Sequence, residues 1–200
     1  MTDARETLRG LLDGIASPTP SGGGGAAAAL AGATAAALVG MVAGVAAHRA
    51  PDDAGLREIV GEAHALRARM LALIEGDVAA FGRVVDARRR TDDGRATAVR
   101  DALIGATEVP LELAAASTRV LEQCATLLPR ARPSTRADLG VAAALAAGAL
   151  EGAALTVRAN LETLDAPAFV AESRRQLDGL LRQGTALRSR LPRAREEEIR

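Results

Sequence analysis

Two long stretches rich in alanine and glycine constrain the fold more than any other feature of this chain. They cover residues 26–47 and 139–160, and small residues recur in each at every fourth position, as along one face of a helix. A glycine inside a helix costs about 1 kcal/mol relative to alanine, so such a row favours a second helix backbone lying close against it. We therefore expect two closely packed central helices, which meet either within one chain or between two. Their rows are Gly32, Ala36, Gly40, Gly44 and Gly140, Ala144, Gly148, Gly152.

The other apolar residues also recur with helical spacing, and no segment alternates with the two-residue period of a strand. The pattern predicts an all-α bundle of about six helices with long antiparallel helices. It also predicts one domain over residues 1–191 and a charged, frayed tail over 192–200. We expect Asp138 to cap the fifth helix and Pro110 to kink the fourth near Thr107. The other expected helices cover about 3–14, 26–47 and 95–128; a further one follows the break at 51–53 and ends at about 89, and the last follows the break at 165–167 and ends near 191.

Composition excludes several classes of function. The 25 arginines balance 25 acidic residues, and Phe81 and Phe169 are the only aromatic residues, so we expect no nucleic-acid partner. The chain contains no lysine, which excludes Schiff-base and Walker-type lysine chemistry. The single Cys124 lies on an apolar helical row and is expected to be an inert buried thiol in a reducing cytoplasm. His48 and His64 lie too far apart in the sequence to indicate a metal site.

The stretch 26–47 contains no charged residue and is about as long as a membrane span. Alanine and glycine contribute little transfer free energy, and the segment before this stretch is not a basic leader. We therefore expect a helix buried by protein and no membrane partner.

Asp77 lies in a helical row whose other members are apolar, where an unpaired carboxylate would cost several kcal/mol if the row is buried in the core. Two interpretations stay open: Asp77 reaches the edge of its helix seam and meets water or an arginine, or it serves a functional site.

Further polar groups lie at the ends of the two small-residue helices. The loop before the first helix ends in Gly23, Gly24 and Gly25, and a helix N-terminus beside such a loop can hold an anion. The second helix ends in Thr156 and Asn160, and a buried amide needs either a neighbouring helix carbonyl or a ligand.

Short motifs follow one another over nearly the whole chain, and in this order they resemble the cyclodeaminase/cyclohydrolase family. That family includes formiminotetrahydrofolate cyclodeaminase and bacterial methenyltetrahydrofolate cyclohydrolase. The motifs are Gly23-Gly24-Gly25, Gly32-Ala33, Met41-Val42, Asp77 with Ala80-Phe81, Val109-Pro110-Leu111, Arg136-Ala137-Asp138 with Val141-Ala142-Ala143, and Asn160-Leu161.

The resemblance implies an all-helical cytoplasmic homodimer with sites near the subunit interface. It implies an enzyme that acts on a carbon–nitrogen bond through an iminium or amidinium species, with a tetrahydrofolate derivative as substrate and no required cofactor or metal. By position, Asp77 and Asp138 are the catalytic groups. The substrate-binding residues are Gly23, Gly24, Gly25, Arg136, Thr156 and Asn160.

Some polar positions of the family pattern differ here: a serine of the glycine loop is Ala26, and an asparagine is Thr156. Two alternatives therefore stay open. One is an imine cyclase or hydrolase that acts on a non-folate substrate in specialised metabolism, and the other is a catalytically silent helical dimer.

Overall fold

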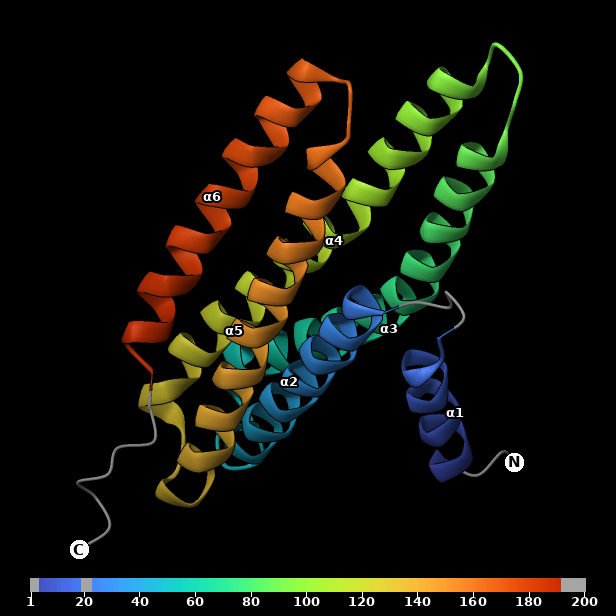
Figure 1. Ribbon diagram of the computed structural model, residues 1–200. Coiled ribbons are helices and arrows are strands. Elements are labelled where there is room, and N and C mark those ends of the chain that lie inside the picture. The colour runs from blue at the N-terminus through green and yellow to red at the C-terminus, as the bar shows by residue number, and fades with distance from the viewer. Residues whose placement is uncertain (1–3, 19–22, 192–200) are drawn as a thin grey trace, which may run out of the picture.

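The computed structural model describes residues 4–18 and 23–191 of the chain. These residues form six α-helices and one short 3₁₀ turn and contain no strand, which confirms the predicted all-α class (Figure 1). The elements are α1 (Ala4–Ala16), α2 (Gly24–Ala47), α3 (Ala54–Arg89), α4 (Arg95–Leu127), η1 (Leu128–Arg130), α5 (Pro133–Glu162) and α6 (Pro167–Ser189). The predicted tail over 192–200 lies outside the described residues.

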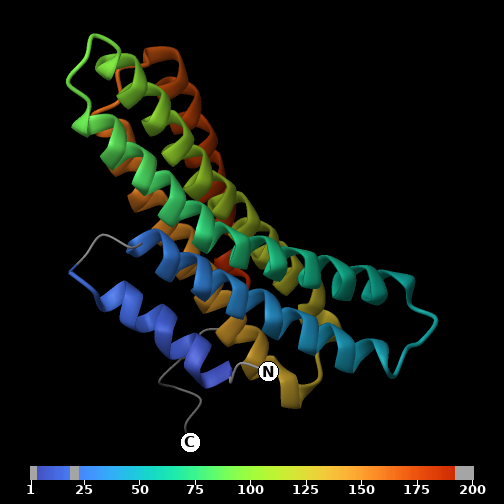
Figure 2. The same ribbon diagram turned by 90° about the vertical axis from the view of Figure 1, so that its right-hand side faces the viewer.

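Helix α2 lies in the centre of the molecule and packs against both α3 and α5. Helix α4 packs against α3 and α5, and α6 covers α4 and α5. The α3–α4 and α5–α6 hairpins have their tips at the same end of the molecule, whereas α1 lies outside the bundle (Figures 1 and 2).

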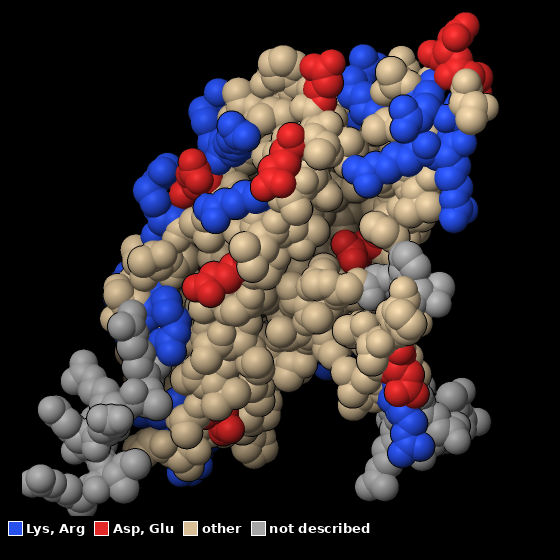
Figure 3. All heavy atoms as spheres, viewed as in Figure 1, with Lys and Arg blue, Asp and Glu red and all other residues tan. Residues whose placement is uncertain are grey.

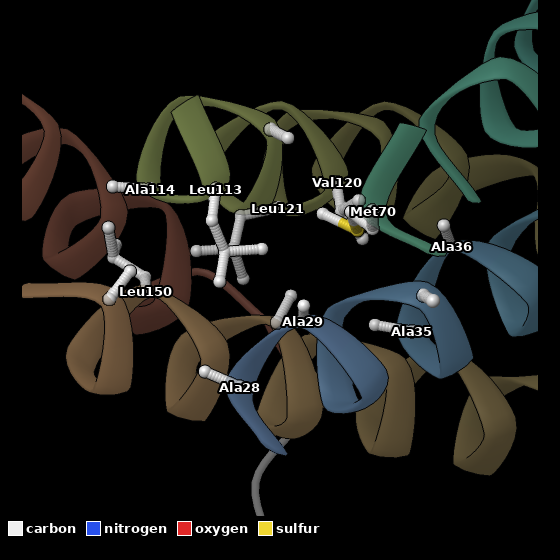
Figure 4. Packing of buried hydrophobic residues seen from close by; sticks show 14 of the residues in the cluster. Ala28, Ala29, Ala35, Ala36, Met70, Leu113, Ala114, Val120, Leu121 and Leu150 are labelled. Carbon is white, nitrogen blue, oxygen red and sulfur yellow. The ribbon is translucent and has the colours of Figure 1, made fainter. Parts of the chain in front are cut away.

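Small side chains let the central helices come close together. A Cβ atom added to Gly152 on α5 would lie 3.0 Å from the Cβ of Ala28 on α2, and one added to Gly32 would lie 2.9 Å from the Sδ of Met70. Larger side chains fill the remaining space around these alanines, among them Met70, Leu113 and Leu121 (Figure 4). The close contact between the two Ala/Gly helices is therefore confirmed.

Part of the small-residue pattern nevertheless faces outward. Ala144 and Gly148 on α5 are exposed, and a Cβ atom added to Gly44 or Gly148 would meet no atom within 4 Å. The expectation that the whole rows line the helix contact is wrong at these positions. The side of α5 that faces the core instead carries Leu139, Ala142, Ala143, Ala146, Ala149, Leu150, Ala153, Ala154, Val157 and Leu161.

The predicted cap of the fifth helix is also wrong. Helix α5 begins at Pro133, so Asp138 lies in its second turn and caps nothing. Proline is favoured in the first turn, where its missing N–H costs no hydrogen bond, and Arg132 before it has the extended backbone typical of an N-cap residue. Helix α6 also begins at a proline, Pro167.

Cys124 is fully buried on α4, and this burial raises the pKa of its thiol to about 12. The expected burial of this thiol is therefore confirmed, and a raised pKa disfavours the thiolate, which is the reactive form.

By length and hydropathy, α2 and α5 are each long and apolar enough to cross a membrane. In the structure they are core helices, with 56% and 44% of their most apolar windows buried inside the protein.

Candidate active site

A cleft of about 410 Å³ opens at the N-terminal end of α2, between α2, α3, α4 and α5. It brings together six residues that the sequence singled out from distant segments: Gly23, Gly24, Gly25, Asp77, Thr156 and Asn160. Ile15 and Ser17, at the end of α1, complete its rim.

Asp77 is half-buried in the middle of α3 and faces the first turn of α2. The backbone N–H of Ala26 donates to its carboxylate, so Asp77 supplies an acceptor to a helix end that has no side-chain cap of its own. Burial raises the pKa of the Asp77 carboxyl, and the Ala26 hydrogen bond opposes this shift only in part. Asp77 therefore holds its proton to a higher pH than an ordinary aspartate does.

Gly25 makes this arrangement possible. A Cβ atom at this position would overlap the carboxylate of Asp77. A glycine is therefore required here by the close approach of α3 to the first turn of α2.

Asn160 on α5 forms a hydrogen bond to α4, at a backbone carbonyl that Pro110 leaves without a helical partner. Because Pro110 lacks an N–H, the carbonyl of Ala106 one turn earlier has no helical donor. The Nδ2 of Asn160 donates to that carbonyl at 2.8 Å. Of the two interpretations of Asn160, the helix-carbonyl partner is the one observed, although the residue also lines the cleft.

The remaining predicted residues occupy different places. Thr156 lines the cleft and donates its hydroxyl to the carbonyl of Gly152 at 3.2 Å. Asp138 and Arg136 lie on the far part of α5 and do not line the cleft. About six helical turns, or about 33 Å, separate Asp138 from Asn160. Within one chain, the structure therefore does not bring Asp138 together with Asp77.

A second half of the cleft was not predicted from the sequence. Phe81, Val84 and Leu103 line it with apolar surface, and Arg88 lies farther along α3. Phe81 had been named only as a rare aromatic residue and as part of a family motif, and Val84, Leu103 and Arg88 had not been singled out. For Phe81, Val84 and Arg88 the available signal was their spacing from Asp77, because positions 4, 7 and 11 residues later share its helix face.

The polar half of the cleft suits chemistry on a cationic carbon–nitrogen centre. A carboxylate with a raised pKa can neutralise such a centre and move a proton, and the first turn of α2 presents amide N–H groups to a developing negative charge. Among residues 4–18 and 23–191, no group of three or more His, Cys, Asp and Glu side chains is arranged to hold a metal ion.

The chain is similar to known proteins over most of its length. A family model described as formiminotransferase-cyclodeaminase matches residues 7–179. Methenyltetrahydrofolate cyclohydrolase of Methylorubrum extorquens is 35% identical over 195 residues, which cover 93% of this chain and 94% of that protein. Formimidoyltransferase-cyclodeaminase of Sus scrofa is 29% identical over 137 residues, 66% of this chain but 25% of the longer relative.

The fold is likewise similar to a solved structure. The crystal structure of formiminotetrahydrofolate cyclodeaminase from Thermotoga maritima matches with a TM-score of 0.85 and 23% identity over 92% of both chains. This likeness shows the fold, and the family model together with the bacterial relative shows that the chain belongs to the formiminotransferase-cyclodeaminase family.

Proposed function

We propose that this protein hydrolyses the methenyl bridge of a tetrahydrofolate derivative, as a cyclohydrolase. The full-length similarity to a methenyltetrahydrofolate cyclohydrolase supports this reaction and favours it over a non-folate imine substrate or a silent dimer. The observation that carries it is the half-buried Asp77 carboxylate, which has a raised pKa and faces the first turn of α2 in a cleft.

In the proposed reaction, ionised Asp77 lies beside the amidinium cation of the bridge and accepts a proton from the attacking water as the C–O bond forms. The same proton then passes to one of the two bridge nitrogens as its C–N bond breaks. The hydroxyl of the adduct loses its proton to solvent, which leaves a formyl group on the other nitrogen. Amide groups of Gly24 and Gly25 lie where they can stabilise the developing oxygen charge.

Cyclodeamination is the second candidate, because the matched family model and the structural neighbour carry that name. It forms the bridge amidinium that hydrolysis consumes, by attack of a folate nitrogen on the formimino carbon and departure of ammonia. Asp77 would then accept the proton of the attacking nitrogen and return it to the departing one. Neither reaction draws on a cofactor in this scheme.

We also propose that the protein works as a homodimer in the cytoplasm and binds neither membranes nor nucleic acid. The outer face of α2 and α5 is largely free of charge (Figure 3). Exposed apolar residues on it include Met41, Val45, Val141 and Leu155. Gly44 and Gly148 have no neighbour on this face that explains a glycine, whereas a helix of a second copy would explain both.

A dimer of this kind also offers a role for Asp138 and Arg136. Antiparallel pairing of α5 with its own copy about a two-fold axis that passes outside Gly148, halfway along the helix between residues 138 and 160, would bring the Asp138 of one subunit level with the Asn160 of the other. Asp138 would then reach the cleft of the other subunit as a second charged group, with Arg136 as a substrate ligand.

Two measurements test these proposals. The first measures hydrolysis of methenyltetrahydrofolate as a loss of the bridge absorbance, and a parallel assay measures ammonia release from the formimino derivative. No turnover of either substrate at high enzyme concentration would overturn the folate assignment. Light scattering of Gly148→Leu tests the dimer, with Gly61→Leu on an equally open part of α3 as its control. We expect the first variant alone to dissociate, and a monomeric wild type would contradict the dimer.

A further inference from the structure

Acidic, apolar and basic side chains line the cleft in this order along one face of α3. Asp77, Phe81, Val84 and Arg88 follow one another along α3 and all line the cleft. Eleven residues of helix separate the first from the last, which corresponds to about 16 Å. A ligand that fills the cleft therefore meets a carboxylate, then an aromatic and apolar wall, and then a guanidinium group.

Phe81 is unusual among these residues. It is one of two aromatic residues in the chain, and 42% of its surface is exposed although it lies one turn from Asp77. Val84 and Leu103, beside it in the cleft, are 5% and 3% exposed. Packing of the core does not account for an exposed aromatic ring there, whereas stacking on a planar group of a ligand does.

Arg88 is the only one of three consecutive arginines that lines the cleft. Its neighbours Arg89 and Arg90 pair with Asp86 and Asp92, whereas no described carboxylate forms an ion pair with Arg88. Side chains on a helix lean toward its N-terminus, so the guanidinium of Arg88 extends back toward Phe81. Other arginines gather near the α3–α4 tip, which makes this end of the molecule favourable for an anion (Figure 3).

We propose that Phe81 and Arg88 form a binding subsite for the arm of the substrate that carries a benzoyl ring followed by a carboxylate. This inference rests on the proposed function, because a folate carries its p-aminobenzoyl-glutamate arm next to the one-carbon bridge. With the bridge at Asp77, the benzoyl ring stacks on Phe81 and a glutamate carboxylate accepts hydrogen bonds from Arg88. These two residues therefore hold the reacting carbon in register with Asp77.

The test uses the full-length protein and the fragment p-aminobenzoylglutamate, which lacks the bridge and cannot react. In proton NMR, stacking on Phe81 shifts the aryl protons of the bound fragment upfield. We expect Phe81→Leu to abolish this shift and to weaken binding about fivefold or more, and Phe81→Tyr to restore both. Phe169→Leu is the matched control, because the other phenylalanine lies on α6 and does not line the cleft.

The carboxylate contact has its own comparison. We expect Arg88→Gln to weaken binding of the fragment about 10- to 100-fold, and to leave the weak binding of p-aminobenzamide, which has no carboxylate, unchanged. Equal shifts for wild type and Phe81→Leu, or equal affinities for wild type and Arg88→Gln, would overturn the subsite. Because the fragment assay needs no turnover, it can succeed where the folate reaction fails, and the two failures stay distinguishable.

Discussion

Replacing Asp77 by asparagine separates the catalytic role of this side chain from its structural one. The asparagine keeps the size of the carboxylate, and its Oδ1 can still accept the N–H of Ala26 at the start of α2. The variant loses the ability to accept and return a proton and the negative charge beside a cationic substrate. Loss of a general acid–base group lowers kcat/KM by about 10²- to 10⁴-fold, which corresponds to about 3 to 5 kcal/mol of transition-state stabilisation.

Stability is expected to change far less. The hydrogen bond from Ala26 becomes one to a neutral acceptor, which costs about 1 kcal/mol, but the cost of burying a charge disappears at the same time. The free energy of unfolding of Asp77→Asn at neutral pH should therefore stay within about 1 kcal/mol of wild type. Asp77→Ala is the matched comparison, because it removes the acceptor as well and should cost about 0.5 to 2 kcal/mol, as for the loss of a helix cap.

The assay combines absorbance kinetics on methenyltetrahydrofolate with urea unfolding of the three proteins. Retention of activity within tenfold in Asp77→Asn would refute the catalytic role. A loss of stability as large as in Asp77→Ala would refute the account of the Ala26 hydrogen bond.

Three further predictions follow from neighbouring contacts. Gly25→Ala should displace the Asp77 carboxylate and lower kcat/KM about 100-fold. Gly61→Ala is the control, because its added Cβ meets no atom within 4 Å and should leave activity intact. Equal activities of the two variants would contradict the close approach of Asp77 to Gly25. The pKa of Asp77 is 3.8 in the unfolded chain and higher in the native state, so between these two pKa values the native state binds more protons than the unfolded state. The free energy of unfolding should therefore fall as the pH rises from 3.8 to the native pKa, while kcat/KM rises as Asp77 ionises. A stability profile identical to that of Asp77→Asn would contradict this. Asn160→Leu leaves the Ala106 carbonyl without a donor and should destabilise the protein by about 1 to 3 kcal/mol in urea unfolding, and an unchanged midpoint would argue against the bridge to α4.

The sequence was sufficient for the helical class because its apolar residues repeat with helical spacing along the whole chain. It was less informative about helix ends, since Pro133 and Asp138 both offer a plausible start for α5 and backbone geometry decides for the proline. The sequence showed the rows of glycine but not which way each glycine faces, because a small residue allows close packing against a helix of the same chain or of a second copy. Gly152 therefore meets α2 while Gly148 faces outward.

The polar half of the site was predictable for a related reason. Asp77 and Asn160 interrupt apolar rows, and a polar residue in such a row requires a partner. The spacing of Phe81 from Asp77 puts both on one helix face, but Phe81 also fits the apolar row there, so the sequence did not distinguish a core ring from one exposed in a cleft. The dependence of Asn160 on Pro110 was also hidden, because it joins residues on two helices that only the fold brings together.

A crystal structure with a non-hydrolysable methenyl-folate analogue tests the central claim most directly. The account predicts the bridge carbon beside the Asp77 carboxylate, about 3 to 3.5 Å from the water that Asp77 orients. An analogue bound away from the N-terminal end of α2, with Asp77 facing solvent alone, would contradict it.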